Sequence, residues 1–216
     1  MSDLPSSPNR VVFSPAPVLL ASLVLALIAS VSANAQGGQG YAFHPNQEVR
    51  VRGLSSSSAP SSNASAVLAA ALEIVLHHKA VCCGKNSALE DIVLSAPPSL
   101  RELSSKLQGA HILSDGRSVM VNADYVSQGA TTPDLIISLL LDQHAPLLDW
   151  KSHVYVLYGA VFDETRYDDG RRQYGIKRLL LRDPRFSDQR GEVVFNRETD
   201  NWGDVQGLLT VSAARQ

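Results

Sequence analysis

Residues 153–161 of the sequence read HVYVLYGAV, and residues 174–182 read YGIKRLLLR. Both are apolar runs of strand length, and residues 168–170 between them (DDG) have the composition of a hairpin turn. Two further runs, 191–195 and 205–211, have the same apolar character and a similar length. The C-terminal part of the chain therefore predicts an antiparallel β-sheet.

The residues before this region follow the helical period instead. Apolar side chains fall on one stripe over residues 66–78, which predicts a first helix. Residues 83–94 predict a second helix, and residues 99–107 predict a third that begins with a capping box. Residues 132–141 predict a fourth, with a proline in its first turn. Helices followed by an antiparallel sheet are the α+β pattern.

The N-terminal segment predicts a secretion signal. Arg10 precedes an apolar run over residues 18–31, and residues 33–35 (ANA) fit the small-x-small rule for signal peptidase. We expect residues 1–35 to be removed by cleavage after Ala35, which makes the protein secreted or periplasmic. The alternative is an uncleaved N-terminal anchor, but the apolar run is short for a membrane span.

After the signal we expect a linker and one folded domain. Residues 36–64 are rich in Gly, Ser, Asn and Pro, and such a segment buries too little apolar surface to offset its ordering entropy. Residues 65–213 are apolar, periodic and long enough to form a core. The net charge is −2 and basic residues are dispersed, so we expect neither nucleic acid nor, after signal cleavage, a membrane as a partner. The sequence does not indicate an oligomeric state.

The two cysteines of the chain are adjacent, at Cys82 and Cys83. Adjacent cysteines form a disulfide only with strained geometry, and free thiols are unusual in an oxidising compartment. Cys83 precedes Gly84 and the predicted helix over 83–94, where backbone N–H groups favour a thiolate and can hold an oxyanion. Cys83 is therefore a candidate nucleophile. The alternative is a pair of small buried residues.

His153 and Asp183 would supply the other groups that a thiol nucleophile needs. His153 opens a predicted strand, where it can act as a base and then as an acid towards the leaving group. Asp183 ends the next predicted strand, and an acid there can orient the histidine. Each also has a structural interpretation, as a surface histidine at a strand end and as an Asp-Pro turn. Asp149 is the second candidate for the orienting acid.

These motifs resemble those of the papain-like cysteine peptidases, and within them the C39-like branch. The resemblance covers most of residues 75–212, and it depends on residues 83–89, 145–147, 153–159 and 181–184. It implies a papain-like fold, in which a helical part with the nucleophile helix packs on an antiparallel sheet. It also implies cleavage of peptide or isopeptide amide bonds through a thioester, although some relatives transfer acyl groups instead. By resemblance, the nucleophile is Cys83, the general base is His153 and the orienting acid is Asp183.

The chain departs from the family at the residue six places before the nucleophile. The family usually has a glutamine there, whose amide completes the oxyanion hole, and this sequence has His77. A histidine N–H can donate to an oxyanion, with a changed pH dependence, so His77 joins the candidate catalytic residues. The resemblance implies a peptide or protein substrate, and we expect no cofactor.

Two other classes of function stay open. One is a peptidase-like binding domain without activity, in which Trp150 and Trp202 are exposed beside the site and recognise a ligand. The other is a metal site, because residues 77–78 (HH) and 82–83 (CC) offer nitrogen and sulfur ligands for zinc or cuprous copper. Adjacent ligands point in divergent directions, and the sequence has no second His/Cys cluster to complete the set. We therefore expect no metal.

Overall fold

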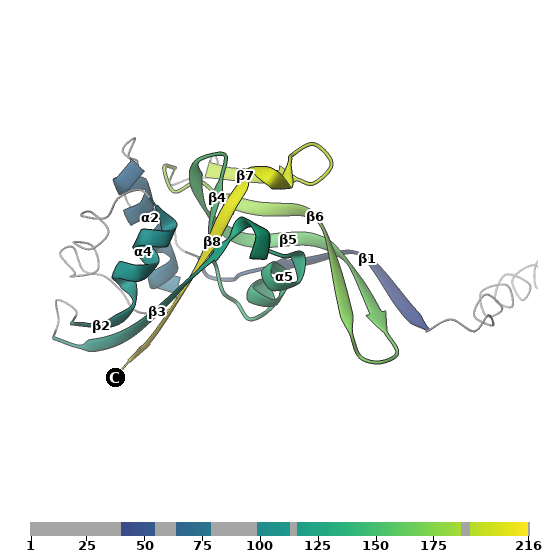
Figure 1. Ribbon diagram of the computed structural model, residues 1–216, viewed down its shortest axis with the longest axis horizontal. Coiled ribbons are helices and arrows are strands. Elements are labelled where there is room, and N and C mark those ends of the chain that lie inside the picture. The colour runs from purple at the N-terminus through teal and green to yellow at the C-terminus, as the bar shows by residue number, and fades with distance from the viewer. Residues whose placement is uncertain (1–39, 55–63, 79–98, 113–115, 187–190, 216) are drawn as a thin grey trace, which may run out of the picture. The chain divides into compact units, whose positions relative to one another are not determined.

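The computed structural model describes residues 40–54, 64–78, 99–112, 116–186 and 191–215 (Figure 1). The described helices and strands all belong to one compact unit, Tyr41–Gln216. The helices are α2 (Ala64–His78), α4 (Leu100–Leu107) and α5 (Pro133–Leu141), and the strands are β1 (Tyr41–Arg50), β2 (Gly109–Ile112), β3 (Ser118–Ser127), β4 (Leu147–Trp150), β5 (His153–Tyr167), β6 (Arg172–Arg182), β7 (Glu192–Asn196) and β8 (Val205–Arg215).

The eight described strands form one antiparallel sheet. Seven of them follow the order β2-β3-β8-β4-β5-β6-β7, and β1 pairs with β5 outside this path. The strand β5 pairs with β4 through its first residues, with β1 through its second half, and with β6 along most of its length. Since a strand has two edges, β4 and β1 share one edge of β5 and β6 occupies the other.

The predicted α+β class is confirmed at a coarse level, because the described residues combine three helices with an antiparallel sheet. The order along the chain is more mixed than we predicted. The strand β1 precedes the helices, and β2 and β3 lie between α4 and α5. The flexible linker expected over residues 36–64 is wrong for residues 41–50, which form β1. Backbone pairing with β5 holds β1, and most of its side chains are exposed, so its composition resembles that of a linker.

Three of the four predicted helices are confirmed as α2, α4 and α5. Side-chain caps explain why α4 and α5 begin where they do. Ser99 accepts a hydrogen bond from the Glu102 backbone N–H at 3.5 Å, and Thr132 accepts one from the Leu135 N–H at 3.3 Å. Pro133 occupies the first turn of α5. The predicted helix over residues 83–94 lies outside the described residues.

The predicted strands are confirmed as parts of β5, β6, β7 and β8. The turn between β5 and β6 is the predicted one, because Gly170 has a φ of 85° and its N–H donates to the Tyr167 carbonyl at 2.9 Å. Two register shifts interrupt the pairing of β5 with β6. Tyr158 is an extra residue on β5, and Lys177 is an extra residue on β6.

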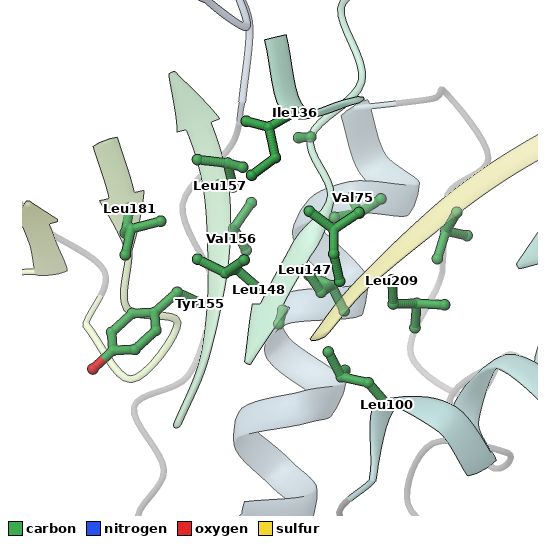
Figure 2. Close-up of a cluster of buried hydrophobic side chains, with 14 of the residues drawn as sticks. Val75, Leu100, Ile136, Leu147, Leu148, Tyr155, Val156, Leu157, Leu181 and Leu209 are labelled. Atoms are coloured by element: carbon green, nitrogen blue, oxygen red, sulfur yellow. The ribbon is translucent and has the colours of Figure 1, made fainter. Parts of the chain in front are cut away.

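The core lies on both faces of the sheet. The strand β5 is buried without interruption from Tyr155 to Phe162, which requires that both of its faces are covered. The helix α2 packs against β5 and β8, and α5 packs against β1, β5 and β6. Figure 2 shows Ile136 of α5 near Leu157 of β5, and Val75 of α2 near Leu209 of β8.

The close approach of β1 to β5 at Gly159 gives a test of this packing. A Cβ atom at Gly159 would lie 2.7 Å from the Val49 carbonyl oxygen and 3.0 Å from Leu180 Cδ1. We expect Gly159→Ala to lower the free energy of unfolding by about 2 kcal/mol, because a strand backbone must shift to make room. Urea denaturation followed by circular dichroism measures the change.

The matched control is Gly175→Ala in β6, where an added Cβ meets no atom within 4 Å. Its effect should stay within about 0.5 kcal/mol. Equal losses in the two variants would contradict the close packing of β1 on β5.

Candidate functional site

A two-residue turn places His153 at the start of β5. Trp150 and His153 are cross-strand partners, and Lys151 and Ser152 connect them. Both turn residues have positive φ, 52° for Lys151 and 61° for Ser152. A hairpin turn with two positive φ values matches the right-handed twist of the strands, although glycine or asparagine is usual there. The His153 side chain is exposed beside this turn.

Contacts with the connection between β7 and β8 hold the turn in this conformation. The Lys151 Nζ atom donates to Asp200 Oδ1 at 3.0 Å, and the Lys151 backbone N–H donates to the Asp204 carbonyl at 3.1 Å. The same ammonium group lies 4.5 Å from the centroid of the Trp150 ring. A positive φ at a non-glycine residue costs on the order of 1 kcal/mol, so the turn depends on these contacts.

His153 and Asp183 lie on the same face of the sheet. Side chains alternate along a strand, so His153 shares its face with Tyr155 and Leu157. Leu157 is the cross-strand partner of Leu181, and Asp183 follows two residues later. The Asp183 backbone N–H donates to the carbonyl of Gly191, the residue directly before β7. The His153 and Tyr155 rings are edge to face at 6.3 Å, and the charge of Asp183 acts on both groups. The structure therefore brings together two of the predicted site residues.

Arg185 holds the Asp183 carboxylate. Asp183 is 3 % exposed, and its Oδ1 atom accepts hydrogen bonds from the Arg185 backbone N–H at 3.0 Å and from Nε at 2.9 Å. Its Oδ2 atom accepts from Arg185 Nε at 2.9 Å and pairs with Nη2. Burial raises the pKa of Asp183, but the hydrogen bonds and charge of Arg185 outweigh it, so the pKa lies below that of an ordinary aspartate. Asp183 is therefore a buried, ionised carboxylate.

The hydrogen bonds of Asp183 go to Arg185 and not to His153. Among the described residues, the His153 ring has no hydrogen-bond partner, and its influence on Asp183 is electrostatic. The sequence analysis did not select Arg185. The available signal was its position two residues after Asp183, across the Asp-Pro step, which is the spacing at which an aspartate can bond the following backbone and side chain.

Asp149, the second candidate for the orienting acid, lies on the other face of β4. Its cross-strand partner is Val154, whose side chain points away from the face of His153. The Asp149 Oδ1 atom is buried, and it has no hydrogen-bond partner among the described residues. Burial raises the pKa of Asp149, and the charge of His153 lowers it. Asp149 therefore lies on the wrong face to orient His153 directly, whereas Asp183 lies on the face of His153.

The expectation that Trp150 is exposed for ligand recognition is wrong. Trp150 is 6 % exposed, and its ring lies 5.7 Å from that of Tyr155 and 5.4 Å from that of Phe195. Trp202 lies 5.6 Å from Phe195 and is half-buried. These rings form an aromatic cluster under the β4–β5 turn. The physical reason is the turn itself, which directs Trp150 inward beneath Lys151.

The remaining candidate residues lie at the end of α2 and after it. Cys82 and Cys83 lie outside the described residues. His77 belongs to the last turn of α2, and the description does not extend to its side chain. Within the described ranges, no three His, Cys, Asp or Glu side chains gather as a metal site would require. In the same part of the chain, no helix combines the length and the apolar character needed to cross a membrane.

Comparison with known proteins identifies no relative of this chain. No protein-family model, curated protein or solved structure matches it. The papain-like fold and the relation to C39-like peptidases therefore remain predictions from the sequence motifs.

The strained turn beside His153 gives a stability prediction. Glycine adopts positive φ without a steric cost, so we expect Ser152→Gly to raise the free energy of unfolding by about 0.5 kcal/mol, after the entropy that glycine adds to the unfolded chain. The matched control is Ser212→Gly in β8, where the same change in an extended strand should destabilise by a similar amount. Thermal unfolding of both variants measures the signs. Destabilisation by Ser152→Gly would contradict the turn conformation.

The Asp183–Arg185 pair gives a prediction for pH dependence. Because the pKa of Asp183 is lower in the folded protein than in the unfolded chain, its contribution to stability is present above the ordinary value of 3.8 and is lost as the pH falls below it. We expect Asp183→Asn to destabilise the protein at pH 7 by about 3 kcal/mol, and this difference to shrink towards pH 2. Urea denaturation at several pH values measures it.

The matched control is Asp124→Asn, at an exposed position of β3. Its effect should be within about 0.5 kcal/mol at every pH. A loss for Asp183→Asn that does not change with pH would show that the ionised carboxylate is not what stabilises the fold.

Proposed function

We propose that this protein is a secreted cysteine hydrolase that cleaves peptide or isopeptide amide bonds. In this proposal Cys83 is the nucleophile, His153 is the general base and Asp183 is the acid that acts on His153. The observation that carries it is the position of an exposed imidazole at the start of β5, with a buried, ionised carboxylate on the same face of the neighbouring strand. The order of the three residues along the chain is that of the family it resembles.

The chemistry follows from the properties of these groups. His153 accepts the proton of the Cys83 thiol, and the sulfur attacks the amide carbonyl carbon to form a tetrahedral oxyanion. Backbone N–H groups and His77 donate to that oxyanion. The carbon–nitrogen bond then breaks, the leaving amine takes the proton from His153, and a thioester remains. Water, deprotonated by His153, hydrolyses the thioester and restores the thiol.

Asp183 would act through the positive charge that His153 carries during each cycle. A carboxylate on the same face stabilises the imidazolium, and burial strengthens this interaction because water screens it less. The exposure of His153 suits the same role, since the imidazole must exchange protons with a thiol, an amine and water. The proposal also places the protein outside the cytoplasm, with residues 1–35 removed as a signal.

A second candidate is a peptidase-like binding domain without activity, or an acyltransferase on the same fold. Two observations favour loss of hydrolysis: the histidine at position 77 and the commitment of both Asp183 oxygens to Arg185. An acyltransferase would form the same thioester and pass the acyl group to an amine or alcohol instead of water. Only the reactivity of Cys83 separates the catalytic proposals from the binding domain.

The first experiment is mass-spectrometric mapping of thiol alkylation on the mature protein at pH 6. We expect Cys83 to react at least about tenfold faster than Cys82, since a thiolate paired with His153 persists at a pH where an ordinary thiol is protonated. His153→Ala should slow the labelling of Cys83. The control His44→Ala, which changes a histidine in β1, should leave it unchanged.

Slow labelling of Cys83 in the wild type would overturn the hydrolase proposal. So would equal labelling in the wild type and His153→Ala, or a disulfide between the two cysteines that persists after mild reduction. Each of these results would favour the binding domain.

A further inference from the structure

Arg185 is a charged side chain beside the proposed site to which the chemistry above gives no role. It contacts Asp183 through its backbone N–H and through its guanidinium, and both carboxylate oxygens are engaged. The Arg185 side chain is 35 % exposed, whereas that of Asp183 is 5 % exposed. The carboxylate is therefore held inside the protein by a cation that reaches the surface.

Among the described residues, few other charged groups face this pair. The charges that act on Asp183 are those of Arg185 and His153, and the Asp183 charge acts in turn on the Tyr155 hydroxyl. Lys151 acts on Tyr155 from the turn. Asp149 acts on His153 from the opposite face of β4. Within the described ranges, an imidazolium at His153 would thus meet one carboxylate on its own face, and that carboxylate is already paired with a guanidinium.

A carboxylate in this position needs a partner of this kind. Burial disfavours the charged form of a carboxylate, so an unpaired buried carboxylate has a raised pKa and no fixed direction. A planar guanidinium offers several donors in a fixed fork, so it fixes the direction of the carboxylate as well as its charge. Its positive charge also cancels part of the attraction that the carboxylate exerts on a proton at His153.

We propose that Arg185 is a positioning residue that sets the protonation of His153 in two ways, by holding Asp183 in place and by opposing the charge of that carboxylate at the imidazole. Arg185 keeps Asp183 ionised and fixed on the face of His153, and it limits how strongly that carboxylate favours the imidazolium. The inference rests on the proposed function for its meaning, because the imidazole that it concerns is the general base proposed above. The contacts that support it do not involve Cys83.

A purely structural role for Arg185 makes a different prediction. The pair also lies at the start of the connection from β6 to β7, where the Asp183 N–H donates to the Gly191 carbonyl at 2.7 Å. A structural clamp would change stability when it is removed, but it would leave the titration of His153 where it was. The titration therefore separates the two roles.

The experiment is an NMR titration of the His153 ring protons in the mature protein, with His153→Gln to assign the signal. In Arg185→Gln a cation is lost and a carboxylate remains, so the His153 midpoint should rise by about 0.5 to 1 pH unit. In Asp183→Asn the carboxylate is lost and the cation remains, so the midpoint should fall by a similar amount. The double variant loses both charges, and its midpoint should return close to that of the wild type.

The double variant also protects the test against misfolding. It buries no unpaired charge, so it should fold even if Arg185→Gln does not. Its comparison with Asp183→Asn then isolates the effect of Arg185. Arg197→Gln is the matched control, because the Arg197 guanidinium lies 5.8 Å from the Trp202 ring and pairs with no part of Asp183.

Equal midpoints in Asp183→Asn and the double variant would overturn the proposal, as would an unchanged midpoint in a folded Arg185→Gln protein. The titration does not need a reactive thiol. A failure of the hydrolase proposal would therefore appear in the alkylation of Cys83, and a failure of this one would appear in the His153 midpoint.

Discussion

The backbone pairing of β5 is the constraint on which the rest of this structure depends. Three strands pair with it, with β4 and β1 on one edge and β6 on the other. Its side chains are buried continuously on both faces, so α2 and α5 have a common surface to pack against. The first residue of this strand is His153, so the pairing of β5 with β4 fixes where His153 lies.

Two kinds of interaction then decide the character of the site. Aromatic packing and the contacts of Lys151 hold the turn that precedes His153, at the cost of two positive φ values. An ion pair holds Asp183 in its charged form against the effect of burial. The second interaction is the larger, because an unpaired charge in the interior costs several kcal/mol, whereas a strained turn residue costs about 1.

The sequence predicted those elements whose signals are local. The helices α4 and α5 carry side-chain caps at Ser99 and Thr132, and the strands β5 and β6 are long apolar runs around a turn that contains glycine. It did not predict β1, because that strand depends on pairing with residues more than a hundred positions away and exposes most of its side chains. The strands β2, β3 and β4 were missed as well, and β4 is too short to show a period.

The candidate site likewise combines features that have a local sequence signal with features that depend on distant parts of the chain. His153 and Asp183 were selected because each stands at the end of a predicted strand, but their common face depends on a register that no local signal specifies. The burial of Trp150 follows from a hairpin turn made by Lys151 and Ser152, and neither residue is typical of such a turn. The ion pair with Arg185 required knowledge that Asp183 is buried.

The two bulges between β5 and β6 have a consequence for how this chain can vary. Tyr158 adds one residue to β5 and Lys177 adds one to β6, so the additions cancel and Asp183 arrives opposite Tyr155. The number of residues that each strand has between the 168–170 turn and the site therefore sets which residues face each other there. Loss of a single residue in either strand would move Asp183 to the other face, whereas the loss of one residue from each strand would keep Asp183 opposite Tyr155. Length changes in this hairpin are therefore tolerable only in matched pairs, even where substitutions are accepted freely.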